Sequence, residues 1–71
     1  MSNAEEILQI IDDGLLVEDK AIKLYSSILK NSDFIKTIPV ESKEKINSYL
    51  DILINESSKH EKFLNEIKTQ L

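Results

Sequence analysis

Two glutamates and the single histidine of the chain are the residues best suited to chemistry: Glu18, Glu56 and His60. Glu56 and His60 are four residues apart, so on a helix their side chains project from adjacent turns of one face. Carboxylates together with a neutral imidazole form a ligand set that suits iron, manganese or zinc. We therefore predict that Glu56 and His60 can bind one metal ion together, with Glu18 as a further ligand.

Apolar residues around these side chains recur at steps of three and four, which indicates two amphipathic helices. Glu18 fills the position that the first apolar seam skips. That seam comprises Ile7, Ile11, Leu15, Ile22, Tyr25 and Leu29. Glu56 and His60 fill the two positions that the second seam skips. It comprises Ile46, Tyr49, Leu53, Phe63 and Ile67. A parallel row that also passes through Ser57 and His60 is an alternative, and it comprises Leu50, Leu53, Leu64, Ile67 and Leu71. We therefore expect all three ionisable side chains to point into the core.

A single break separates the two periodic segments. Residues 31–42 read NSDFIKTIPVES and concentrate turn and capping residues. We predict a single domain over residues 1–71, with a helix over about 4–30, a connector over about 31–40 and a second helix over about 41–70. Three apolar residues of the connector are expected to fold back as a lid over one end of the core: Phe34, Ile35 and Ile38.

Gly14 is the one residue that disfavours a continuous first helix, because glycine in a helix interior costs about 1 kcal/mol relative to alanine. A break there would give a short helix over 5–12 and a longer one from residue 15. The apolar spacing continues through Gly14 without a change of phase, so we predict one continuous helix. A close approach of the second helix at Gly14 would explain the glycine.

Composition excludes several classes of protein. The chain has 71 residues and no cysteine, so disulfides and thiolate metal sites are excluded. With 13 acidic against 9 basic residues it lacks the basic surface expected of a nucleic-acid-binding protein. No stretch approaches the roughly 18 uninterrupted apolar residues of a membrane span, and the acidic start MSNAEEILQI does not resemble a signal peptide. We therefore expect a cytoplasmic protein that binds neither nucleic acid nor membrane.

A hairpin of two helices cannot cover its own apolar surfaces, and it contains only three of the predicted ligands. Both deficits are relieved if two hairpins pair about a twofold axis. The pair contains four glutamates and two histidines, which is the ligand inventory of a di-iron carboxylate site. We therefore predict an all-α fold, an antiparallel two-helix hairpin that dimerises, or forms a larger homo-oligomer, as a four-helix bundle.

Two segments resemble the ligand helices of rubrerythrin-like and ferritin-like proteins. VEDKAIKLYSSI resembles the first, in which a glutamate is followed by alanine three residues on and tyrosine seven residues on: Glu18, Ala21 and Tyr25. LINESSKHEKFLNEI resembles the second, in which an acidic and polar run, here Glu56 to His60, ends in histidine and is followed by an acid and apolar residues. The resemblance covers both helices, as one half of the usual four-helix domain.

The resemblance implies that Glu18 is the ligand from the first helix and that His60 is the imidazole ligand. It also implies an iron or manganese site at a homodimer interface, used for ferrous oxidation, peroxide reduction or metal storage. One position differs: the family places its glutamate three residues before the histidine, where this chain has Ser57, and Glu56 lies one residue earlier. The alternative is therefore a metal-free dimerisation or interaction module that keeps the fold with a degenerate metal site.

Overall fold

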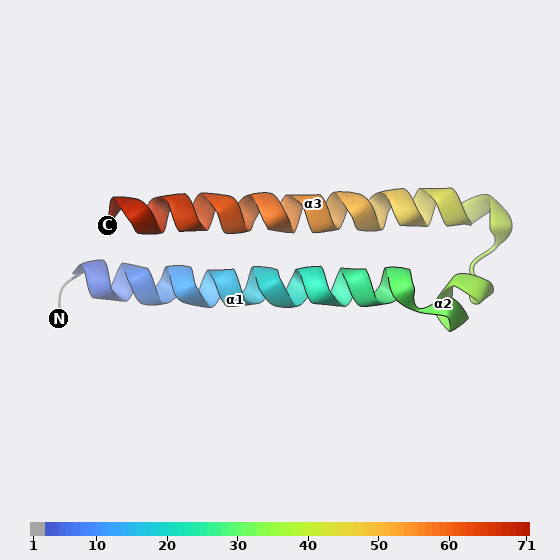
Figure 1. Ribbon diagram of the computed structural model, residues 1–71, viewed down its shortest axis with the longest axis horizontal. Coiled ribbons are helices and arrows are strands. Elements are labelled where there is room, and N and C mark those ends of the chain that lie inside the picture. The colour runs from blue at the N-terminus through green and yellow to red at the C-terminus, as the bar shows by residue number, and fades with distance from the viewer. Residues whose placement is uncertain (1–2) are drawn as a thin grey trace.

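The computed structural model describes residues 3–71. Within this range it describes every side chain except those of residues 32 and 35. It contains three helices, α1 (Asn3–Lys30), α2 (Ser32–Thr37) and α3 (Val40–Gln70). Figure 1 shows α1 and α3 lying antiparallel along their length, with α2 at the turn between them. The predicted all-α helical hairpin is therefore confirmed. No helix within residues 3–71 is both long and apolar enough to cross a membrane.

Helix α1 runs without a break through Gly14, as predicted. A Cβ atom added at Gly14 would lie 3.3 Å from the Cδ1 atom of Leu64, which is closer than most such contacts. The missing side chain therefore leaves room for the close approach of α3 to α1 at this level.

The segment between the long helices is more ordered than the sequence predicts, because it contains α2. The side-chain oxygen of Asn31 accepts a hydrogen bond from the backbone N–H of Phe34 at 3.0 Å and so caps this short helix. Of the predicted lid, Ile38 is buried whereas Phe34 is 40% exposed. The side chain of Ile35 lies outside the described set. Pro39, with φ −56°, precedes α3 and needs no backbone donor there.

The hairpin has a very small core. Among the described residues only three apolar side chains are buried: Ile11, Ile38 and Leu50. None of the described side chains is fully buried. The Cα atoms extend over 54 × 16 × 12 Å and have a radius of gyration of 16.3 Å. A compact domain of this length would have a radius of gyration of about 11 Å. The molecule is therefore an elongated single layer of two helices.

Of the two rows predicted for the second helix, the one through Leu50, Ser57 and Leu64 lies nearer the side that packs against α1, and the seam through Tyr49 and Phe63 does not pack there. The side of α3 that faces α1 is marked by Leu50, Ile54, Ser57, Glu61 and Leu64, which are buried or half-buried. In contrast, Tyr49, Leu53, Phe63 and Ile67 are 42–55% exposed. The reason is that α3 carries two apolar stripes about 100° apart around its axis. Periodicity finds both stripes, but it does not tell which one packs against α1.

Candidate functional site

The antiparallel packing of α1 and α3 brings Glu18 and His60 together at mid-length. The Nδ1 atom of His60 lies 3.3 Å from the Oε1 atom of Glu18. The same alignment places Gly14 against Leu64. The Glu18 side chain is 21% exposed and that of His60 is 54% exposed. Glu18 is therefore held mainly between the helices, whereas His60 reaches it from the solvent-facing side of α3.

Glu56 does not join this pair. Its Oε1 atom lies 3.4 Å from the Nζ atom of Lys59, and its side chain is half exposed. Within one hairpin, the expectation that all three ionisable residues point into the core is therefore wrong for Glu56 and His60. Both lie on the α3 stripe that faces away from α1. No three His, Asp or Glu side chains among residues 3–71 form a group that could hold a metal ion. A single hairpin therefore does not assemble a complete metal site.

The middle of the interface between α1 and α3 contains two polar residues that are not among the predicted ligands. Ser57 is buried. The Oε1 atom of Glu61 is buried and has no hydrogen-bond partner in the described part of the chain. Their spacing from Ile54 and Leu64, at steps of three and four, was the available signal that both face α1. An unpaired buried oxygen is costly, so the seam is not optimised for stability at this level.

Nine large apolar side chains that are 42–69% exposed form what we call the apolar face. Four belong to α1: Ile7, Ile10, Val17 and Leu24. Five belong to α3: Tyr49, Ile52, Leu53, Phe63 and Ile67. Glu56 and His60 lie between Leu53 and Phe63 in the same stripe, so the candidate ligands are part of this face.

The two stripes of the apolar face lie on the same side of the hairpin. At 3.6 residues per turn, the centre of each stripe is rotated by about 100° from the side of its helix that faces the partner helix, and in the same sense; Ile7 lies nearer that side and Ile52 farther from it. Antiparallel helices are related by a local twofold axis perpendicular to the plane of their two axes. Equal rotations in the same sense therefore bring both stripes to one side of that plane, where they make one continuous surface.

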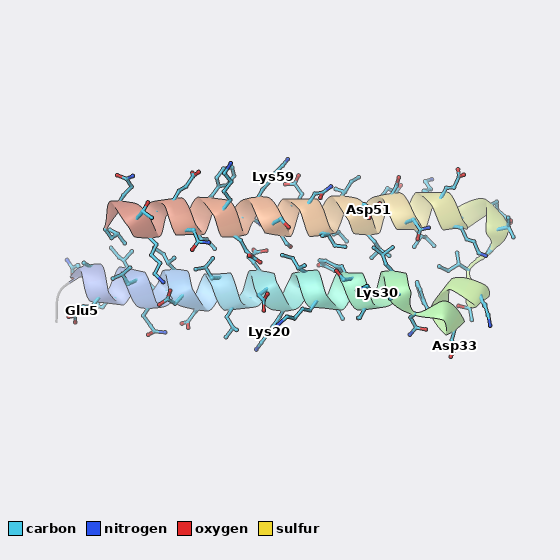
Figure 2. The ribbon with its side chains drawn as sticks, viewed as in Figure 1. Glu5, Lys20, Lys30, Asp33, Asp51 and Lys59 are labelled. Carbon is cyan, nitrogen blue, oxygen red and sulfur yellow. The ribbon has the colours of Figure 1, made fainter. Side chains whose placement is uncertain are left out.

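The opposite side of the hairpin, which we call the polar face, carries charged and amide side chains. The same rotation places eight residues there: Asp12, Asp19, Lys23, Asn47, Asp51, Ser58, Lys62 and Asn65. On it, Asp19 pairs with Lys23 at 2.9 Å, and the hydrogen bond to Asp19 raises the pKa of Lys23. In Figure 2, Lys20 and Lys59 point outward from the two edges of the hairpin, away from the opposite helix. Only one of the two broad sides is therefore apolar.

An open depression near the start of α1 is unrelated to these residues. It is lined by Glu5, Glu6, Gln9 and Ile10, all from one helix. A depression formed by successive turns of a single helix lacks the convergent walls of a ligand pocket. The Glu18–His60 pair and the apolar face around it are therefore the features to which a function can be assigned.

Comparison of the chain with protein-family models, with characterised proteins and with solved structures finds no match. The resemblance to rubrerythrin-like and ferritin-like proteins therefore rests on the residues quoted for it, which are the Glu18, Ala21 and Tyr25 pattern and the run from Glu56 to His60. It stays a prediction.

Proposed function

We propose that this chain is a helical interaction module that functions by packing its apolar face against another helical surface. The observation that carries the proposal is the contrast between nine exposed large side chains on that face and three buried apolar side chains in the whole described hairpin. Monomeric soluble proteins rarely leave a contiguous apolar surface of this extent open to water. A second layer of helices is the common means of covering such a stripe.

The Glu18–His60 pair, of which His60 lies within the apolar face, limits how a partner can align. His60 is half exposed and contacts Glu18, so a partner placed over it has to offer a polar group or leave room for water. A polar residue in an otherwise apolar helix interface selects one alignment at some cost in stability. On this proposal, Glu18 and His60 contribute to specificity rather than to affinity.

Photo-crosslinking in cells of the source organism tests the proposal. A photoreactive phenylalanine analogue is placed at position 63 on the apolar face. A matched control has it at position 16, because Leu16 is also exposed but lies outside the face. We expect discrete crosslinked adducts from position 63 and none above background from position 16. Equal or absent adducts at the two positions would contradict the proposal.

A second candidate function, a ferritin-like iron or manganese site at a homodimer interface, is favoured by the 3.3 Å contact between Glu18 and His60. That contact places the predicted carboxylate and imidazole ligands from two helices side by side. Two paired hairpins would contain four glutamates and two histidines when Glu56 is included. A bound iron ion would supply the redox chemistry of an oxidase, peroxidase or iron-storage role. The chain's own contribution would be to bind and orient that ion.

Native mass spectrometry after anaerobic loading with Fe²⁺ or Mn²⁺ tests the second candidate. The metal proposal predicts a stoichiometric ion that is lost in Glu18→Ala and in His60→Ala. Glu66→Ala serves as the matched control, because it removes an exposed carboxylate from the same helix without touching the pair. Absence of bound metal in the parent chain, or equal loss in the control, would contradict the metal-site proposal.

A further inference from the structure

We infer that the apolar face is covered by a second copy of this chain, so that two hairpins pack face to face through that surface. The inference rests on the proposed interaction function and deepens it by naming the partner. On α3 the interface is the stripe that contains Tyr49 and Phe63, which was predicted from sequence as the apolar seam of this helix, and not the side that packs against α1.

The area of the apolar face is close to what a stable dimer needs. An aromatic side chain buries about 150–250 Å² when fully covered. Seven of the nine side chains are smaller aliphatic ones, so the low end of this range applies, and nine side chains near half exposure offer on the order of 700 Å² per hairpin. Specific protein interfaces bury about 800 Å² on each partner. The apolar face therefore comes close to this size without any contribution from the polar face.

A second hairpin also supplies the layer that this fold lacks. Two helices make one layer, and stable domains pack at least two layers around a core. A second copy carries the same apolar stripes, from Ile7 to Leu24 on α1 and from Tyr49 to Ile67 on α3, so the two surfaces match over about 27 Å of each helix. A twofold arrangement uses the same surface on both partners, which satisfies both copies at once.

The distribution of charge also fits an apolar partner. Glu56, His60 and the hydroxyl of Tyr49 are the ionisable groups within the apolar face, and Asp13 lies at its edge, about 20° around α1 from Leu24. Lys20 and Lys59 lie at the edges and point outward (Figure 2). Two copies with a formal charge of −4 each can therefore approach through this surface while most of their charges remain in water.

Sedimentation equilibrium of the purified chain and two leucine variants tests the inference. Leu24 and Leu16 both belong to α1 and are 57% and 53% exposed, but only Leu24 lies on the apolar face. We expect two-chain particles for the parent and for Leu16→Glu. Leu24→Glu should raise the dimer dissociation constant at least about 100-fold, because each dimer then buries two carboxylates. Phe63→Glu repeats the test on α3, and circular dichroism reports whether each variant is helical.

Two results would overturn the inference. One is a parent chain that stays monomeric up to about 1 mM. The other is an equal weakening by Leu16→Glu and Leu24→Glu. If the purified parent is monomeric while position 63 crosslinks to a different protein in cells, the interaction function stands and the second-copy inference is wrong. If the purified parent is monomeric and position 63 also forms no adduct in cells, both the interaction function and the second-copy inference are wrong.

Discussion

The two long sides of α3 differ in a way that runs against the usual expectation for a helical protein. The side that faces α1 carries Ser57 and Glu61 at mid-length, whereas the side that faces water carries Tyr49 and Phe63. A helix normally turns its most apolar stripe toward its own core. The difference indicates that the hairpin contact uses only part of the apolar surface of α3, and that a second contact accounts for the rest.

The same contrast holds for α1. Ile11 is 5% exposed at the hairpin seam, and its neighbour Ile10 is 69% exposed on the apolar face. Both are isoleucines with the same transfer free energy, so only their positions around the helix distinguish them. Single substitutions can therefore separate the two contacts.

The largest expected effect comes from Ile11→Ala. Removing a buried isoleucine costs about 2–4 kcal/mol of unfolding free energy, because the cavity at the seam cannot fully collapse. Ile10→Ala is the matched control. When both are made in a Leu24→Glu background, in which the apolar face is uncovered, Ile10→Ala should cost less than about 0.5 kcal/mol. Urea unfolding followed by circular dichroism measures both, and equal costs would remove the distinction between seam and face.

The Glu18–His60 pair is expected to have a smaller and context-dependent effect. A double-mutant cycle with Glu18→Gln and His60→Ala should give a coupling below about 1 kcal/mol in the Leu24→Glu background, since His60 is then half exposed. In the parent chain the coupling should rise to roughly 1–2 kcal/mol, because covering the face removes water from the pair. The same coupling in both backgrounds would place His60 outside the covered surface.

Gly14→Ala is expected to stabilise the hairpin by about 0.5–1 kcal/mol. The gain in helix propensity is opposed only by the Cδ1 atom of Leu64, which would lie 3.3 Å from the added Cβ atom. This flexible end of the Leu64 side chain can move by a few tenths of an ångström. Thermal unfolding measures the change, and the double variant Gly14→Ala with Leu64→Ala removes the contact as a control. A lower melting temperature for Gly14→Ala would show that the two helices cannot separate at this level.

The smallest effect is expected for the ion pair between Asp12 and Lys68, whose atoms lie 2.7 Å apart. Both side chains are about half exposed, so the coupling should be about 0.2–1 kcal/mol and should decrease with added salt. A double-mutant cycle with Asp12→Asn and Lys68→Met at low and high salt measures it. A larger, salt-independent coupling would mean that this end of the seam is shielded from water.

The helices, their approximate ends and the continuity through Gly14 could be predicted from the sequence, because they follow from local periodicity and turn residues. Glu18 and His60 were both predicted as ligands from their residue types and seam positions, and the structure brings these two together while Glu56 stays apart. Helix α2 was missed because a short helix gives little periodicity. Within one hairpin Glu56 and His60 do not face α1, because α3 has two apolar stripes and the choice between them depends on tertiary packing.

Solvent paramagnetic relaxation in NMR tests the central claim most directly, since it reports which side chains water reaches in the purified protein. If the apolar face is covered, the Leu24 methyl and Phe63 ring protons should show weak relaxation enhancement, and the Leu16 methyl protons strong enhancement. In the Leu24→Glu variant, enhancement at Phe63 should rise to the level of Leu16. Strong and equal enhancement at Leu16, Leu24 and Phe63 in the parent chain would contradict the claim that this face is covered.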